Sequence, residues 1–408
     1  MGKWKPMKNC NIHFLPAKAG DCFVLEFSNK ECIIIDCGFK STYKKELRPL
    51  LIELQKKGCK VILLIITHTD QDHIEGAIAF LQENGKANNP NIIQVENIWF
   101  NGFFNTLLRR SEFMDRVRGL TDIQKREKER VLKEFLLQIP GEEGEISAIQ
   151  SISFEELCLN NGYSLNTQFT DKVVKRIENK KKQILKHTIH IGACQVIVLS
   201  PTEKELDKLA DKLNLEMIRN FGVDYSMNQD SQFMKLLELL MELERENMDG
   251  NEEIAAMGDC LESWIGTSTM APVNEINRAS IVVEIIYNDL RLLFTGDSDS
   301  ILWSQYLEKN YHVIKLSHHG TASPNQKLLD STHGDILMVS SDGGYNKRHP
   351  EDEMLAKAIL KGNKKLYFNY EIRQKEKLEK LQKAYGFQCF FGKRKIELQV
   401  VGNGKIYC

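Results

Sequence analysis

The hydrophobic and polar positions of the first hundred residues alternate between strand-like and helix-like spacing. Three short apolar runs, broken by turn-forming residues, predict strands at residues 11–16, 22–27 and 32–36. Leucines at helical spacing predict a helix over residues 44–57, an apolar run predicts a buried strand over 61–66, and a second helix follows at 74–84. This alternation of strands and helices is typical of a layered α/β domain.

The pattern changes in the middle of the chain. Residues 103–186 are highly charged and helical in spacing, a strand follows at 196–199, and a second helical stretch covers 203–262. That second stretch holds 16 Asp and Glu against 6 Lys and Arg, a net charge of −10, and its leucines form an amphipathic face. Solvated helical insertions explain both stretches, and a lid or a docking surface for a protein partner is the alternative.

The α/β pattern returns near residue 280. Strands over residues 281–287 and 291–295 form a predicted hairpin turned at Asn288-Asp289, and further buried strands are predicted at 313–316 and 336–340. We therefore expect residues 1–408 to form a single α/β domain that carries the two helical insertions.

The composition sets limits on this interpretation. The 408 residues are 42% hydrophobic and 27% charged, which excludes a disordered or collagen-like chain, and no apolar run is long enough to cross a membrane. The N-terminus shows no export signal and the ten cysteines show no CxxC spacing, so we expect a cytoplasmic protein without membrane association. The net charge of −1 argues against a generally basic surface. It is, however, a cancellation, because residues 361–408 hold 12 Lys and Arg against 4 Asp and Glu, a net charge of +8.

The candidate chemistry is concentrated in the polar segment after the buried strand at 61–66. Two histidines and two aspartates fall within six residues there: His68, Asp70, Asp72 and His73. Each would need its own polar partner if buried, so a metal site explains the group better than a core does. Asp72 as a helix N-cap is the structural alternative, but a cap needs one such residue rather than four. Because adjacent Asp72 and His73 diverge, the group divides between two neighbouring ions.

Three more polar segments follow apolar strands later in the chain. Asp297 comes after a strand and a glycine, where its carboxylate is well placed to bridge two ions. His318 and His319 precede Gly320 at another strand end, and an Asn-Lys-Arg-His-Pro segment at residues 346–350 follows a further strand. Each segment alone has an ordinary explanation as a turn or loop, but together they are expected to form one site.

These segments resemble the metallo-β-lactamase superfamily, and in particular the hydrolase domain of the ComEC DNA-uptake competence family. The matching motifs are Gly20-Asp21, Ile35 to Gly38, His68 to His73, Asn277 to Ser280, Thr295 to Asp297, Lys315 to Gly320 and Asn346 to Pro350. The membrane channel of ComEC has no counterpart in this sequence. The resemblance implies an αββα sandwich with helical insertions and a dinuclear metal site at the edge of its sheets.

The resemblance also implies a set of metal ligands. His68 and Asp70 would hold the first of two divalent ions. Asp72 and His73 would hold the second, and Asp297 would bridge the two. Asp70 stands where the superfamily usually has a histidine, which makes the site harder and favours Mn²⁺ or Mg²⁺ over Zn²⁺. The expected cofactors are two divalent ions, Zn²⁺ or Mn²⁺, with Mg²⁺ as a further candidate.

The rest of the ligand set that the resemblance implies includes one position that this sequence does not fill with a histidine. His319 would be the last ligand of the second ion, with His318 as the alternative, and Asp36 would orient the loop of His68. The superfamily usually supplies a third histidine in mid-chain, where this sequence has Ser-Pro-Thr at residues 200–202. Only two histidines lie between His73 and Asp297, namely His187 and His190.

We therefore expect a metal-dependent hydrolase, with a phosphodiesterase or nuclease acting on DNA or RNA through a hydroxide at the dinuclear site as the leading function. Asp72 could take up the water proton, and Lys315 and His349 would contact the phosphate or protonate the leaving oxygen. Further expected substrate contacts are Asn346, Ser323 and Asn277. The alternatives are hydrolysis of a small phosphodiester, a nucleotide signal or another ester, and a protein-binding module with a degenerate metal site, which the missing third histidine favours.

Overall fold

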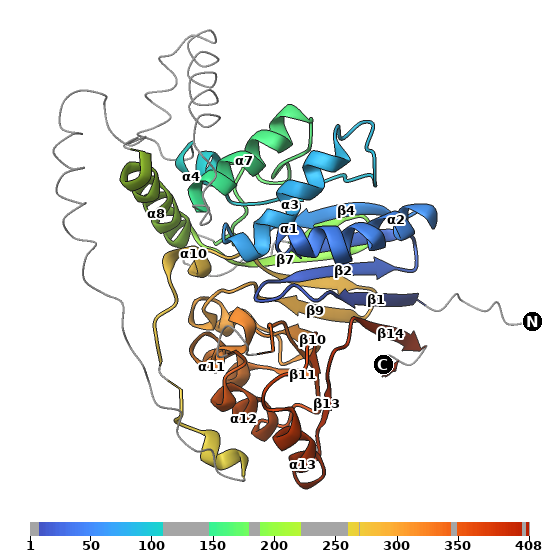
Figure 1. Ribbon diagram of the computed structural model, residues 1–408, viewed down its shortest axis with the longest axis vertical. Coiled ribbons are helices and arrows are strands. Elements are labelled where there is room, and N and C mark those ends of the chain that lie inside the picture. The colour runs from blue at the N-terminus through green and yellow to red at the C-terminus, as the bar shows by residue number, and fades with distance from the viewer. Residues whose placement is uncertain are drawn as a thin grey trace, which may run out of the picture.

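Two β-sheets packed face to face, with helices on both outer faces, make up the computed structural model of the chain (Figure 1). The structure describes residues 8–108, 147–178, 188–221, 260–268, 270–343, 349–401 and 405–407. This layering confirms the αββα sandwich that the sequence predicts.

The first sheet has the strand order β15-β14-β1-β2-β3-β4-β5. Its strands are β1 (Lys8–Phe14), β2 (Cys22–Phe27), β3 (Glu31–Cys37), β4 (Lys60–Ile65), β5 (Ile98–Trp99), β14 (Lys395–Val401) and β15 (Lys405–Tyr407). Strands β3, β4 and β5 are parallel to one another, and the pairs from β15 to β3 are antiparallel. The two ends of the chain therefore belong to the same sheet.

The second sheet has the strand order β13-β12-β11-β10-β9-β8-β7-β6. Its strands are β6 (Thr188–Ile191), β7 (Cys194–Ser200), β8 (Val282–Tyr287), β9 (Leu290–Phe294), β10 (Asn310–Lys315), β11 (His333–Val339), β12 (Lys365–Phe368) and β13 (Gln388–Phe390). The pairs from β9 to β13 are parallel. The hairpin predicted at Asn288-Asp289 is confirmed, because Tyr287 pairs with Leu290 and Asn288 has the positive φ, 55°, that a tight turn needs.

The helices of the first sheet's outer face are α1 (Lys40–Thr42), the π-helix η1 (Tyr43–Leu47), α2 (Arg48–Lys56), α3 (Gln71–Asn84) and α7 (Ser147–Asn160). The second sheet's outer face carries η2 (Leu261–Trp264), η5 (His318–Gly320), α11 (Ala322–Ser331), α12 (Asp352–Leu360) and α13 (Lys375–Tyr385). The remaining helices are α4 (Phe103–Leu108), α8 (Glu203–Phe221), α10 (Glu275–Arg278), η3 (Ser300–Leu302) and η4 (Ser304–Tyr306). Figure 1 shows α8, α4 and α10 together at one end of the sandwich.

Hydrophobic side chains fill all three spaces between the layers. Phe23 and Leu25 of β2 pack between the two sheets, whereas Val24 of the same strand packs under the helices of the first sheet. In the second sheet, Leu293 of β9 packs under the helices on that sheet's outer face. Both faces of the central strands, such as β2, β3, β4 and β9, are thus covered, which explains why these strands are continuous apolar runs rather than alternating ones.

The described helices of the predicted insertions pack one face into the protein, and α8 also exposes residues of its other face. A separate hydrophobic cluster joins α4, α7, α8 and α10 through residues such as Phe103, Ile152 and Leu209. Residues 109–146, 179–187 and 222–259 lie outside the described residues, so the acidic docking surface expected within 203–262 stays a prediction.

Among the described residues, no helix has the length and apolar character to cross a membrane.

A buried glutamate fixes α4 against α7. Both oxygens of Glu155 accept backbone N–H groups at the start of α4, from Phe104 and Asn105, each at 3.0 Å. The side chain is buried, and burial raises the pKa of Glu155 to about 7 even though these N–H donors favour the charged form.

This raised pKa predicts a pH-dependent stability. The folded protein holds the Glu155 proton more tightly than the unfolded chain, so the contribution of Glu155 to stability is greatest below pH 4.5 and is lost as the pH rises through 7, by about 3 kcal/mol over the whole range. E155Q carries no titrating group there. We expect thermal unfolding in a metal chelator to show a smaller loss of stability between pH 5 and pH 8 for the variant than for the wild type. Equal losses in the two proteins would contradict the assignment.

Candidate metal centre

The His68 segment connects the end of β4 to α3, and a buried carboxylate supports it from behind. Asp36, at the end of β3, accepts the backbone N–H of Thr67 at 2.7 Å, the Thr67 hydroxyl at 2.7 Å and Nδ1–H of His73 at 2.8 Å. Because the Thr67 hydroxyl donates to Asp36, it accepts from Nδ1–H of His68 at 3.0 Å. Both histidines therefore turn Nε2 into the site, the orientation of a metal-ligating imidazole backed by a carboxylate.

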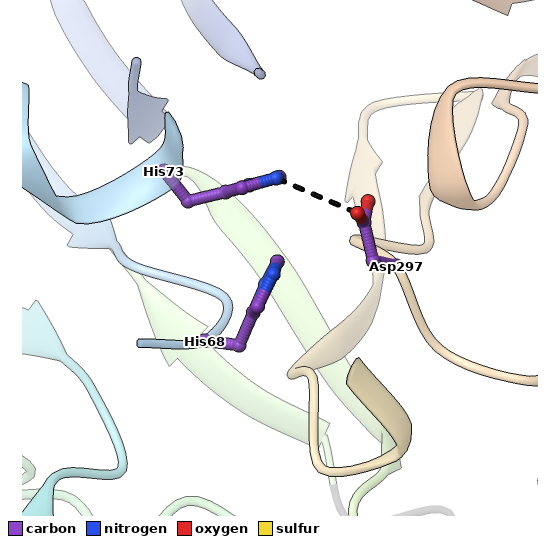
Figure 2. A group of neighbouring side chains, drawn as sticks. All are labelled: His68, His73 and Asp297. Carbon is purple, nitrogen blue, oxygen red and sulfur yellow. Dashed lines mark ion pairs between the residues drawn. The ribbon is translucent and has the colours of Figure 1, made fainter. Parts of the chain in front are cut away.

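Asp297 reaches the same space from the second sheet. It follows β9 and Gly296, whose φ of 51° turns the chain sharply, and its backbone N–H donates to the Ser280 hydroxyl at 3.3 Å. Its Oδ2 lies 3.6 Å from Nε2 of His73. Figure 2 shows His68 and His73 approaching this carboxylate from the first sheet. The structure thus brings Asp297 to the His68 segment, as the sequence predicts for a bridging residue.

His319 completes the cluster from the end of β10. Its Nδ1–H donates to the carbonyl of Ser340 at 3.1 Å, so Nε2 again faces the site, 3.1 Å from Oδ2 of Asp297 and 3.8 Å from Oδ2 of Asp72. His318 and His319 have positive φ values of 47° and 54°, as does Asp36 at 56°. Strained backbone of this kind at three site residues is typical of a functional site.

These contacts define two overlapping groups whose ligand atoms lie within 4.8 Å of one another: His68, His73 and Asp297, and Asp72, His73 and His319. Nε2 of His68 and Nε2 of His73 are buried without a hydrogen-bond partner in the described part of the chain. Unpartnered buried nitrogens among carboxylates are the donor set of a transition-metal or zinc site, so the residues present fit divalent ions.

Charge supports the same conclusion. The site collects five carboxylates, those of Asp21, Asp36, Asp70, Asp72 and Asp297, with the ammonium of Lys315 among them. Two divalent ions and this ammonium would balance the five negative charges. In the protein alone, burial acts to raise the pKa of Asp297, but the nearby His319, His73 and Lys315 outweigh it and hold that pKa well below its usual range.

Asp70 has a less enclosed position than the other acidic residues of the site. Its Oδ2 lies 3.6 Å from Nε2 of His68, and its side chain is 31% exposed. The Ser147 hydroxyl, at the start of α7, donates to its Oδ1 at 3.4 Å. The first insertion therefore touches the metal site at the residue that replaces the usual histidine.

His318 lies on the outer side of His319. Its Nε2 is 4.0 Å from Oδ2 of Asp297 and its side chain is 27% exposed, so the geometry favours His319 as the ligand. Burial lowers the pKa of His318 to about 4, which leaves the ring neutral at neutral pH. The ring of His349 lies 5.8 Å from that of His318, and its Nδ1 is hydrogen-bonded to the Thr321 hydroxyl at 3.2 Å. His349 is thus beside the cluster, as the sequence predicts.

Lys315 occupies a different place from the predicted one. Its side chain is 1% exposed, and its ammonium contacts Asp21, the carbonyl of Gly296 at 2.8 Å and Oδ1 of Asp297 at 3.4 Å. Three acceptors use the three N–H bonds of an ammonium, which leaves none for a phosphate. We therefore treat Lys315 as a positioning residue rather than a substrate contact. Asp21, the partner of Lys315, is not among the site residues predicted from the sequence, and only the Gly20-Asp21 motif points to it.

The remaining predicted substrate contacts are Asn277, Ser323 and Asn346. Asn277 is buried in α10, and its backbone N–H is taken by Asn274 at 2.8 Å, while Ser323 is half-buried in the first turn of α11. Asn346 lies outside the described residues. Ser200, at the end of β7, is buried in the region where the mid-chain histidine is expected.

His190 does not supply that histidine. It pairs with Gln195 on the edge of the second sheet and is exposed. Ser200 lies five residue steps along β7 from Gln195, a distance of about 16 Å at the rise of a strand. The described part of the chain thus offers the first ion no third histidine.

Comparison with known proteins agrees with this fold. Residues 15–130 match the family model described as "Metallo-beta-lactamase superfamily", whose members are generally metal-dependent hydrolases. A structure of the metallo-beta-lactamase fold protein YhfI from Bacillus subtilis is 9% identical and covers 96% of this chain and 99% of its own, with a TM-score of 0.35. A point mutant of CmlA beta-hydroxylase is 10% identical, covers 97% of this chain and 54% of its own, and has a TM-score of 0.36. Neither likeness supports a function. A search of the curated proteins gives no match.

The carboxylate behind the histidines gives a direct test. In D36N one of the two oxygens is replaced by an amide nitrogen, which cannot accept from Thr67 or His73, so both imidazoles lose their fixed orientation. We expect the affinity for Mn²⁺, measured by calorimetric titration, to fall about 10- to 100-fold. D330N, an exposed change on α11, is the matched control and should bind as the wild type does. An unchanged Mn²⁺ affinity in D36N would show that Asp36 is not needed to orient the two histidines.

Proposed function

We propose that this protein is a metal-dependent phosphodiesterase that cleaves nucleic acid. The observation that supports the proposal is the convergence of three imidazole Nε2 atoms, from His68, His73 and His319, on the carboxylates of Asp72 and Asp297. Two bound divalent ions would lower the pKa of a water and neutralise the charge of a phosphodiester.

The protein's own residues divide into those that hold ions and those that move protons. His68 and Asp70 are proposed for one ion, and Asp72, His73 and His319 for the other, with Asp297 between them. Asp72 has Oδ1 3.9 Å from His73 and Oδ2 3.8 Å from His319, so it stands at the site and can accept a proton from an attacking water.

The leaving group is proposed to meet the outer histidines. His349 and His318 lie side by side next to the cluster, and the Thr321 hydroxyl holds Nδ1 of His349. The Thr321 hydroxyl donates to the carbonyl of His318 at 2.7 Å and so accepts Nδ1–H of His349. His349 would therefore act as the acid in its protonated, imidazolium form, giving the Nε2 proton to the leaving oxygen and becoming neutral. Neutral His318 and half-buried Ser323 would line the same side and contact the phosphate.

The choice of nucleic acid as substrate rests on the ComEC-like order of motifs and on the uneven charge of the chain. The C-terminal segment, with its net charge of +8, offers a cationic region to a polyanion although the whole chain is near neutral. Proteins other than nucleases could use the same metal chemistry, so the substrate has to be tested directly.

The first test is a substrate screen with ligand variants. Single- and double-stranded DNA, RNA and bis(p-nitrophenyl) phosphate are offered with Mn²⁺, Mg²⁺ or Zn²⁺. We expect metal-dependent cleavage of a nucleic acid, and a loss of at least about 100-fold in D72N and D297N, because each loses several kcal/mol of stabilisation of the reacting charge. D330N should retain wild-type activity.

The dependence on salt concentration distinguishes a nucleic-acid substrate from a small ester. Binding of a nucleic acid should weaken steeply as the salt concentration rises, because phosphate contacts release counterions, whereas hydrolysis of a small ester should be much less sensitive. Cleavage of the small diester alone would replace the nuclease by a small-molecule phosphodiesterase. No turnover with any ion would favour a binding module.

His349 has a separate test that depends on the leaving group. H349A should slow cleavage of a diester with an alkyl leaving group by about 100-fold, because that oxygen must be protonated as it leaves. The same variant should be little changed with a p-nitrophenyl leaving group, which departs as a stable anion. H333A, at the start of β11, is the control. Equal losses with both leaving groups would remove His349 from the role of acid.

A further inference from the structure

The turn before β2 reaches the metal site from behind. A Cβ added to Gly20 would lie 1.7 Å from the carbonyl oxygen of Asp72, so only glycine allows this turn to approach the ligand. The carbonyl of Gly20 also accepts the Ser340 hydroxyl at 2.8 Å, which ties the turn to the end of β11. The next residue, Asp21, is thereby placed beside His319 and Lys315.

Asp21 contacts Lys315, at the end of β10, and His319, a proposed ligand of the second ion. Its Oδ2 pairs with the ammonium of Lys315, and its Oδ1 lies 3.7 Å from Nδ1 of His319. That Oδ1 is buried and has no hydrogen-bond partner among the residues described. Asp21 is 1% exposed, so its charge is stabilised by this pair rather than by water.

Lys315 in turn constrains Asp297. Its ammonium lies 3.4 Å from Oδ1 of Asp297, whereas Oδ2 of the same carboxylate faces His73 and His319. The ammonium therefore leaves one oxygen of Asp297 directed to the histidines. Without a carboxylate partner, the same positive charge would lie next to the ions and repel them.

We propose that Asp21 and Lys315 form a charge-matched positioning pair for the second ion. Lys315 orients Asp297 so that only Oδ2 reaches the ions, and Asp21 holds Lys315 in place and cancels its charge. Asp36 supports His68 and His73 in the first sheet, and the new pair supports His319 and Asp297 in the second. The inference rests on the metal site of the proposed function but not on its substrate.

The pair predicts an unusual double-variant result. D21N keeps an oxygen for Lys315 but leaves its positive charge uncancelled, so we expect Mn²⁺ affinity to fall about 10- to 100-fold. Adding K315M removes the repelling charge, so D21N/K315M should bind Mn²⁺ more tightly than D21N. Calorimetric titration of the full-length chain measures both, with folding checked by circular dichroism.

The matched control is the ion pair between buried Glu284 of β8 and Arg291 of β9, whose side chain is 30% exposed. E284Q and E284Q/R291M should lower the temperature of unfolding and leave Mn²⁺ affinity unchanged. A D21N affinity equal to that of the wild type, or a double variant weaker than D21N, would overturn the pairing and leave the proposed function standing. Failure of the wild type to bind Mn²⁺ or Co²⁺ would overturn both.

A spectrum decides the case in which D21N does not fold. The double variant has no unpaired buried charge, and in it both oxygens of Asp297 can reach a metal. We therefore expect its Co²⁺ complex to absorb more weakly in the visible range than that of the wild type, as a higher coordination number requires. An unchanged spectrum would show that Lys315 does not restrict Asp297 and would overturn the proposal.

Discussion

Keeping buried carboxylates partnered is the constraint on which this structure depends. Asp21, Asp36 and Asp297 are each at most 3% exposed, and an isolated buried carboxylate costs several kcal/mol. Asp36 accepts from the Thr67 hydroxyl and from Nδ1–H of His73, and the ammonium of Lys315 contacts both Asp21 and Asp297. Satisfying these carboxylates therefore also fixes the orientation of His73 and Asp297, two of the candidate metal ligands.

The sandwich brings these partners together because several strands end at one edge. Asp36 and Thr67 lie at the ends of β3 and β4 in the first sheet, and Asp297 and His318 follow β9 and β10 in the second. The backbone contact from Ile281 N–H to the carbonyl of Thr67, at 2.8 Å, joins the two sheets beside the site. The hydrophobic layers thus set the positions of the loops, and the buried polar contacts set the directions of the side chains.

The sequence predicted the parts of the site that are local and missed those that depend on distant partners. The His68 segment was evident because four metal-ligating side chains follow one buried strand, and the β8–β9 hairpin because its turn chemistry is contained in two residues. The sequence suggests Lys315 as a substrate contact, because nothing near Lys315 in the sequence shows that its ammonium pairs with Asp21, which lies 294 positions earlier. The sequence left the mid-chain histidine unassigned, because the strand that places His190 on the far edge of the sheet is defined only by its pairing with Gln195.

The support of the two proposed ions is unequal. Asp36 stands behind His68 and His73 and so serves proposed ligands of both ions, whereas the buried pair of Asp21 and Lys315 lies beside His319 and Asp297. On the first-ion side, Asp70 is one-third exposed and is hydrogen-bonded to Ser147 of α7, in a region where the described chain offers no further histidine. A ligand set that is fixed by the core binds an ion with little reorganisation, whereas one that depends on an insertion must order that insertion as well. We therefore expect the first of the two proposed ions to be the more readily exchanged, because its proposed ligand Asp70 depends on a contact from α7.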